Sequence, residues 1–95
     1  MTAATPTTIL VIAATRDPHR QAEALRAALG LTLRGARVEV AVAGPLLTPL
    51  ARRAADTLRS FGHVVGPLAG HLAGDPAGGE LAGALARADR VEVWT

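Results

Sequence analysis

Hydrophobic residues along the chain fall into short runs that alternate with longer segments of helical spacing. Residues 8–14 form an unbroken, β-branched run, which is typical of a strand buried on both faces of a sheet. The run 38–43 alternates at its start, which favours a position nearer an edge. Residues 63–65 form a short third strand and residues 91–94 an alternating last one.

Three segments between these runs have the three-to-four-residue spacing of amphipathic helices: 19–34, 49–61 and 80–88. Asp17 before Pro18, and Thr48 before Pro49, are typical of a cap followed by the first helical residue. The positions expected to face the core are Ala22, Leu25, Leu29, Leu33, Leu50, Ala54, Leu58, Phe61, Leu81 and Leu85.

The resulting order predicts a single α/β domain over residues 1–95, with a mostly parallel four-stranded sheet and helices on both faces. A flavodoxin-like strand order of 2-1-3-4 would place the first and third strands side by side. Their carboxyl ends would then form a ligand crevice. Its candidate lining residues are Thr15, Arg16, Asp17, His19, Gly66, His71 and Asp75.

Each candidate also has an ordinary structural interpretation. Arg16 can be an exposed arginine beside a helix N-terminus, and Asp75 can be a helix cap. His19 and His71 can be solvated loop histidines. The segment 66–79, rich in glycine and proline, is predicted to be the least regular part of the chain.

Composition narrows the possible functions. The formal net charge is only +2, all ten basic residues are arginine, and Phe61 and Trp94 are the only aromatic residues. A basic stripe or stacking aromatics would be expected of a nucleic-acid-binding protein. The absence of cysteine excludes thiolate chemistry and disulfides, and suits a reducing cytoplasm. The first eight residues lack a basic n-region, and the early apolar run is too short to cross a membrane.

Motifs for known cofactors and metals are missing. There is no lysine for a phosphate-binding loop, and the turn after the first strand, Thr-Arg-Asp-Pro-His, is not a dinucleotide fingerprint. The three histidines include no H-x-x-x-H pair. Ser60 lies outside any nucleophile elbow, and His63 is expected to be structural. No cofactor and no metal site are therefore expected.

The stretch 24–40, A-L-R-A-A-L-G-L-T-L-R-G-A-R-V-E-V, follows a strand of the type Ile9-Leu10-Val11-Ile12. It resembles the DsrE/DsrF/DsrH-like family of sulfur-relay proteins, as does the ending 88–94. The compact length is most similar to the DsrH-type subunits. Active members of that family carry a persulfide on a cysteine just after the third strand or its equivalent. Here that region is Val64-Val65-Gly66-Pro67-Leu68, which has no cysteine.

The resemblance implies a non-catalytic, cytoplasmic subunit. It would form a homo-oligomer, or a hetero-oligomer with cysteine-bearing DsrE-like subunits, through contacts such as Ala51, Ala55, Ala82 and Ala86. A second hypothesis is a small-ligand or anion-binding module that uses Arg16, His19 and His71. A third is an enzyme with His71 or His19 as general acid or base beside an acidic group.

Overall fold

Strands and helices alternate along the chain as the hydrophobic pattern predicts. The computed structural model describes residues 6–68 and 80–95. Within these residues the order is β1 (Thr8–Ala13), α1 (Pro18–Thr32), β2 (Arg37–Val42), α2 (Pro49–Ser60), β3 (Val64–Pro67), α4 (Glu80–Arg87) and β4 (Arg90–Trp94). Gly66 and Pro67, expected in an irregular segment, extend β3 instead. The rest of that segment, residues 69–79, lies outside the described residues.

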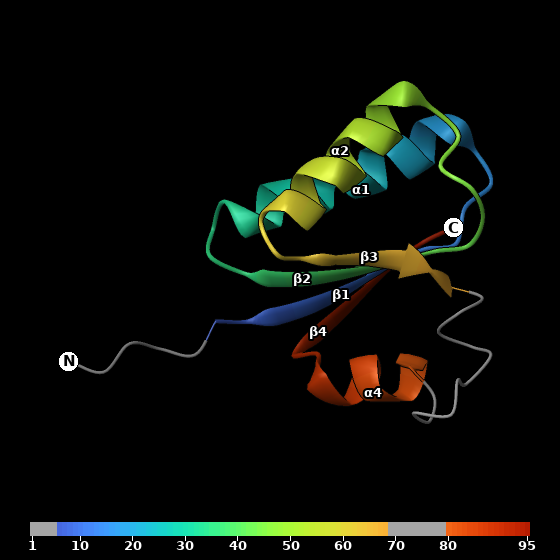
Figure 1. Cartoon of the computed structure of the whole chain (residues 1–95). Coiled ribbons are helices and arrows are strands. Elements are labelled where there is room, and N and C mark those ends of the chain that lie inside the picture. The colour runs from blue at the N-terminus through green and yellow to red at the C-terminus, as the bar shows by residue number, and fades with distance from the viewer. Residues whose placement is uncertain (1–5, 69–79) are drawn as a thin grey trace.

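The four strands form one all-parallel sheet in the order β3-β2-β1-β4, which confirms the α/β fold. The flavodoxin-like order is wrong, because β1 lies between β2 and β4 while β3 pairs only with β2. Figure 1 shows α1 and α2 on the same face of the sheet, and α4 on the other. Two right-handed crossovers with helices on one face must move the chain in the same direction, so β1, β2 and β3 are consecutive.

β2 is an inner strand, although its alternating start suggested an edge. The polar residue responsible is Glu39, which points to the α4 side with its side chain only 13% exposed. There it pairs with Arg87 of α4, whose Nη2 atom lies 3.1 Å from Oε1 of Glu39. The alternation therefore marks a charged contact beneath α4.

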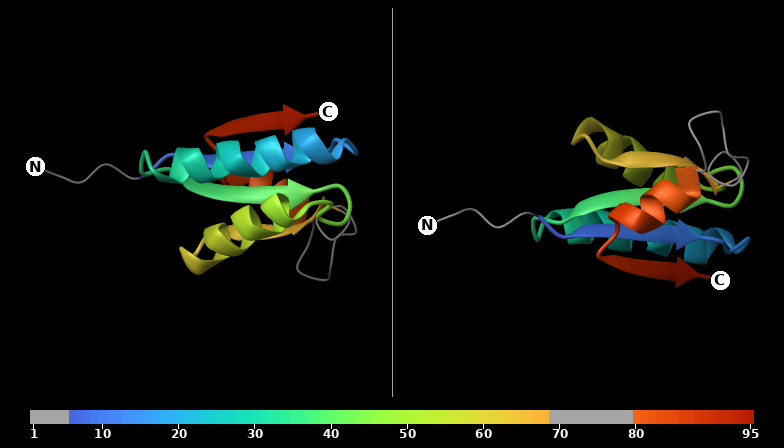
Figure 2. Two further views of the ribbon diagram at one scale, coloured as in Figure 1. Left: turned by 90° about the horizontal axis from the view of Figure 1, so that it is seen from above. Right: turned by 90° about the horizontal axis from the view of Figure 1, so that it is seen from below.

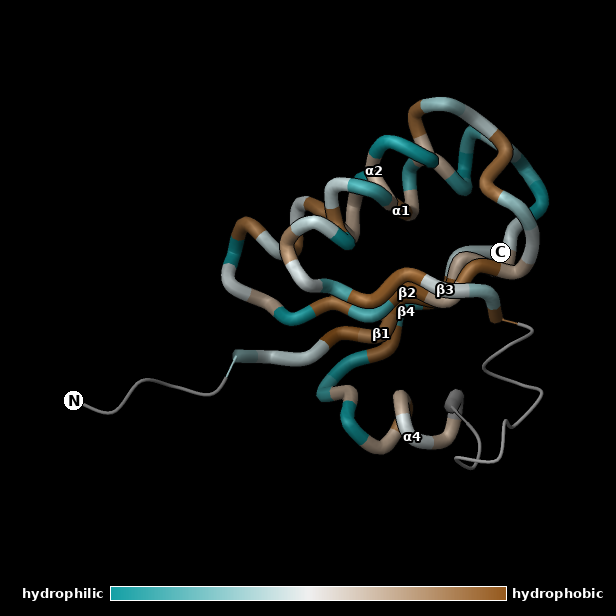
Figure 3. Tube along the Cα trace, in the orientation of Figure 1, coloured by the Kyte–Doolittle hydropathy of each residue, from teal (hydrophilic) through white to brown (hydrophobic). Residues whose placement is uncertain are grey.

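The main core lies between the sheet and the pair α1 and α2, where the strands are strongly hydrophobic (Figure 3). Small alanines on both helices allow close packing. Fully buried residues of this core include Val11, Ala24, Leu25, Ala28, Val40, Ala51, Ala55 and Leu58.

Several expected core positions are exposed. Leu33 and Phe61 are 83% and 66% exposed because they follow the last helical residue of α1 and α2. Leu50 is exposed in the first turn of α2. On α4, Ala84 is buried in place of Leu85, and the Leu81 side chain lies outside the described set.

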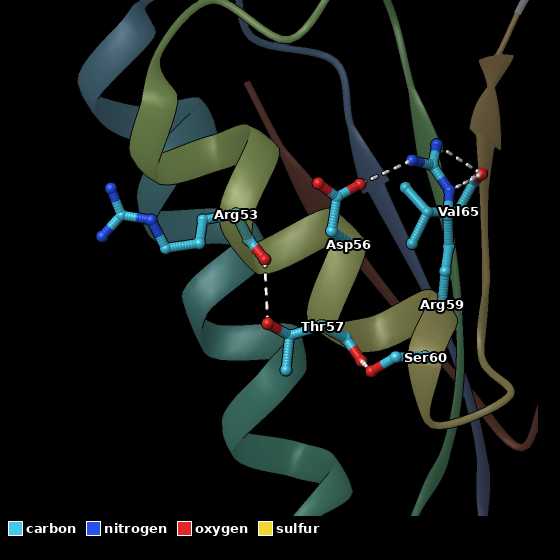
Figure 4. Close-up of polar contacts among 6 residues, drawn as sticks. All are labelled: Arg53, Asp56, Thr57, Arg59, Ser60 and Val65. Atoms are coloured by element: carbon cyan, nitrogen blue, oxygen red, sulfur yellow. Dashed lines mark hydrogen bonds and ion pairs between the residues drawn. The ribbon is translucent and has the colours of Figure 1, made fainter.

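Arg59 connects the end of α2 to β3 through hydrogen bonds, as Figure 4 shows. Its Nε and Nη2 atoms donate to the carbonyl oxygen of Val65 at 3.3 and 3.1 Å. Asp56, one turn earlier, lies 3.5 Å from the same guanidinium. Ser60 donates its hydroxyl to the carbonyl of Thr57 at 2.7 Å, so it has a plain structural role.

Among the described residues, no helix combines the length and the apolar character needed to span a membrane.

Candidate functional site

The loop that follows β2, residues 43–48, forms one wall of a pocket at the carboxyl end of the sheet. It is held at both ends. The Ala43 amide donates to the Ala13 carbonyl at 2.9 Å. The Thr48 hydroxyl accepts from the Ala51 amide at 3.0 Å and so caps α2.

Gln21 of α1 holds the middle of this loop. Its side chain amide donates from Nε2 to the Pro45 carbonyl at 2.9 Å, and its Oε1 accepts from the Leu47 amide at 2.8 Å. Gln21 is only 1% exposed, and both of its polar atoms are satisfied. Gln21 is not among the candidate residues that the sequence pattern indicates. The signal was its position one turn before Leu25 on the buried face of α1.

The pocket has a volume of about 360 Å³ and lies beside the ends of β1 and β2. Arg16 is exposed at its rim and forms no hydrogen bond or ion pair with the described residues. The Thr15 hydroxyl accepts from the Asp17 amide at 3.1 Å, which shapes the turn after β1. The lining residues are Thr15, Arg16, Gln21, Ala43, Gly44, Pro45 and Leu47. A cationic rim over a largely apolar wall can accept a small anion.

The other predicted ligand residues are separated. Asp17 caps α1 by accepting from the amides of His19 and Arg20 at 2.8 and 3.2 Å. His19 is 87% exposed and does not line the pocket. Gly66, from β3, borders a smaller recess on the far side of the 43–48 loop.

The expected crevice between the first and third strands is replaced by these two recesses, because β2 separates β1 from β3. His71 and Asp75 lie outside the described residues. The point at which the strand order reverses lies between β1 and β4. There the Arg20 guanidinium stacks 5.5 Å from the Trp94 ring centre and donates to the Thr95 carbonyl at 2.8 Å.

Among the described residues, His19 does not form an acid–base pair with a carboxylate inside a pocket. The Nε2 atom of its imidazole lies 3.5 Å from the carboxylate of Glu23, one turn along the exposed side of α1. His63 accepts from the Val38 amide at 3.2 Å and joins the start of β3 to β2, which confirms its structural role. Residues 6–68 and 80–95 contain no group of three His, Asp or Glu side chains that could hold a metal.

A second feature is an apolar surface on the α4 side of the sheet. Figure 2 shows β3 on one side of α4 and β4 on the other. Val64 belongs to β3, and Val91 and Val93 belong to β4, at register positions on the α4 face of the sheet. These three and Leu85 are 51%, 39%, 58% and 45% exposed. We call Val64, Leu85, Val91 and Val93 the α4-side surface.

The alanines expected to form subunit contacts are divided between core and surface. Ala51 and Ala55 are fully buried in the core, so they are wrong as contact residues. Ala82 and Ala86 are exposed on α4. The larger apolar side chains near α4 are therefore the better contact candidates.

No protein-family model matches this chain, and no curated protein or solved structure is significantly similar to it. Its function is therefore inferred from the geometry above and from the sequence resemblance over residues 24–40.

Proposed function

We propose that this chain is a non-catalytic subunit that acts by associating with a second copy of itself. The observation that carries the proposal is the α4-side surface, where four large aliphatic side chains remain about half exposed. Apolar residues gathered on one face of a small domain commonly mark a contact with another protein. The role is that of the cysteine-free subunits in the DsrE-like family, in a cytoplasmic setting.

Chemistry and size support the same role. The chain has no cysteine, so it cannot carry a persulfide of its own. A chain of 95 residues buries only about 60–65% of its unfolded surface, and association increases that fraction. Formation of a homo-oligomer would therefore bury the exposed aliphatic side chains and add to the stability of a domain with a small core.

The magnitude of the apolar contribution limits how the copies can meet. Complete burial of a valine or leucine side chain contributes about 1.5–3 kcal/mol, so covering the four half-exposed ones on both copies contributes about 6–12 kcal/mol. Association itself costs about 4–15 kcal/mol. The two terms are similar in size, so the α4-side surface needs a further set of contacts to give a stable complex.

The native mass of the purified chain, measured by light scattering after gel filtration, tests the proposal. We expect a defined oligomer that Leu85→Glu weakens. The matched control is Leu33→Glu, which places the same charge on an exposed leucine that follows α1. A wild-type chain that remains monomeric at millimolar concentration contradicts self-association. If the chain then associates only with a cysteine-bearing DsrE-like subunit, it is part of a hetero-oligomer.

The pocket beside β1 and β2 supports a second candidate function, the binding of a small anion. The specific observation is Arg16, whose guanidinium stands at the rim without a partner among the described residues. We expect phosphate, sulfate or thiosulfate to raise the melting temperature, and Arg16→Gln to abolish the effect. Arg26→Gln, on the exposed side of α1, is the control. An unchanged melting temperature with all three anions argues against this function.

A further inference from the structure

The two edges of the sheet differ in their ability to accept another strand. In a parallel ladder, alternate residues turn their backbone groups to opposite sides of the strand. The register of β3 against β2 leaves the groups of Val65 and Pro67 at the outer edge. The Val65 carbonyl already accepts two hydrogen bonds from Arg59, and Pro67 has no N–H to donate. β3 is therefore a blocked edge.

β4 is an open edge. The Ala14 amide donates to the Trp94 carbonyl at 2.8 Å, so Trp94, Glu92 and Arg90 turn their backbone groups to β1. The N–H and C=O groups of Val91 and Val93 consequently point outward. They form no hydrogen bond with the described residues. Figure 2 shows β4 as the outermost element at this side of the sheet.

We propose that β4 pairs in antiparallel orientation with β4 of a second copy, about a two-fold axis that passes through Val91. This inference rests on the proposed function and supplies the additional contacts that the α4-side surface needs. An axis perpendicular to the sheet keeps both α4 helices on the same face. Val91 of one copy then faces Val91 of the partner subunit, and Val93 lies diagonally beside it, whereas Val64 stays at the opposite edge of the sheet.

The charges of β4 select the register. Outward backbone groups meet in three registers, in which Val91 faces the partner's Val91, Val91 faces the partner's Val93, or Val93 faces the partner's Val93. The first places Arg90 opposite Glu92 of the partner subunit, and symmetry repeats this pair. The second places Glu92 opposite the partner's Glu92, and the third places it opposite the partner's Trp94. Opposite charges facing across an antiparallel pair are stabilising and like charges are not, which favours the first register.

Arg90 and Glu92 can exchange their contact with each other for contacts with the second copy. Arg90 and Glu92 lie on one face of β4, on the α1 side, because their register partners Ile9 and Val11 belong to the core there. Their contact within the strand is 3.0 Å long, with the side chains 56% and 32% exposed. A pair so exposed contributes little in its own strand. Charges of one sign on an edge strand repel a second copy of that strand. An arginine and a glutamate two residues apart instead let each charge face the opposite charge of an identical antiparallel strand.

Charge variants give the decisive test, read by native mass. Arg90→Glu makes this pair of positions wholly acidic, and Glu92→Arg makes it wholly basic. Each alone is expected to weaken the dimer at least about tenfold, because both cross-strand pairs become like-charged. An equimolar mixture of the two variants is expected to restore the dimer, since each acidic position then faces an arginine. Failure of the mixture to associate overturns the proposal.

A backbone variant tests the strand pairing independently of charge. Val91→Pro removes an outward N–H and leaves the ladder with β1 intact, so the domain is expected to remain folded. It is expected to be monomeric, whereas the control Val91→Thr, which keeps the N–H and the β-branched shape, is expected to remain a dimer. A wild-type dimer that tolerates Val91→Pro and both charge variants overturns this inference but leaves the proposed function standing. A monomeric wild-type chain overturns both.

Discussion

Replacing Gln21 with methionine removes both hydrogen bonds that join α1 to the loop after β2. The side chain is 1% exposed and its amide is shared between the Pro45 carbonyl at 2.9 Å and the Leu47 amide at 2.8 Å. Methionine has a similar length and volume, so little cavity forms. The effect of the substitution is therefore dominated by the lost hydrogen bonds.

The expected loss of stability is about 2 kcal/mol, from two hydrogen bonds of about 1 kcal/mol each. Pro45 and Leu47 are exposed residues, so water can replace the lost partners once the loop moves, and no further penalty is added. For a chain of this size, urea unfolding has a slope of about 1–2 kcal/mol per molar, which places the midpoint about 1–2 M lower.

Urea unfolding followed by circular dichroism measures this loss. Arg26→Met, on the exposed side of the same helix, controls for the change in helix propensity. We also expect the Leu47 amide to exchange hydrogen faster in Gln21→Met. A difference from the control of less than about 0.5 kcal/mol refutes the conclusion that Gln21 holds the loop.

Three further substitutions test other parts of the fold. Gly62 has a φ of 86° and no close atom, so Gly62→Ala is expected to cost about 1 kcal/mol of unfolding free energy through backbone strain alone; an unchanged urea midpoint contradicts this. Asp17→Ala is expected to cost about 1 kcal/mol in thermal unfolding because it removes the cap of α1, whereas Asp17→Asn retains most of it; equal melting temperatures for the two contradict the cap. Arg59→Met is expected to cost about 1 kcal/mol by chemical unfolding through the loss of its bonds to the Val65 carbonyl, and full stability in this variant contradicts their contribution.

The helices and strands could be predicted because each buries one face, and burial imposes a period on the sequence. The continuous run of β1 correctly indicated an inner strand. Strand order was not accessible in the same way, since a right-handed crossover can move the chain in either direction along a sheet. That choice depends on which face each helix covers, and α1 and α2 cover the same one (Figure 1).

The candidate site was predictable only on its β1 side. Thr15 and Arg16 follow a recognisable strand, so their place at its carboxyl end could be expected. Gly44 and Pro45 complete the pocket because β2 is the neighbour of β1, a contact far apart in sequence. Gln21 was missed for a related reason: a single glutamine on an apolar stripe does not reveal which loop it will bind.

The pairing of β4 with β1 has a consequence for how the protein is made. The Thr8 amide donates to the Asp89 carboxylate at 2.8 Å, and the Asp89 amide donates to the Thr8 carbonyl at 2.8 Å, across 81 residues of sequence. At a ribosomal rate of about 5–20 residues per second, β1 emerges roughly 4–16 s before its second neighbour exists. During that interval one side of the most hydrophobic strand is unprotected in the nascent chain. Slower translation would lengthen this exposure, so synthesis rate itself becomes a determinant of the yield of folded protein.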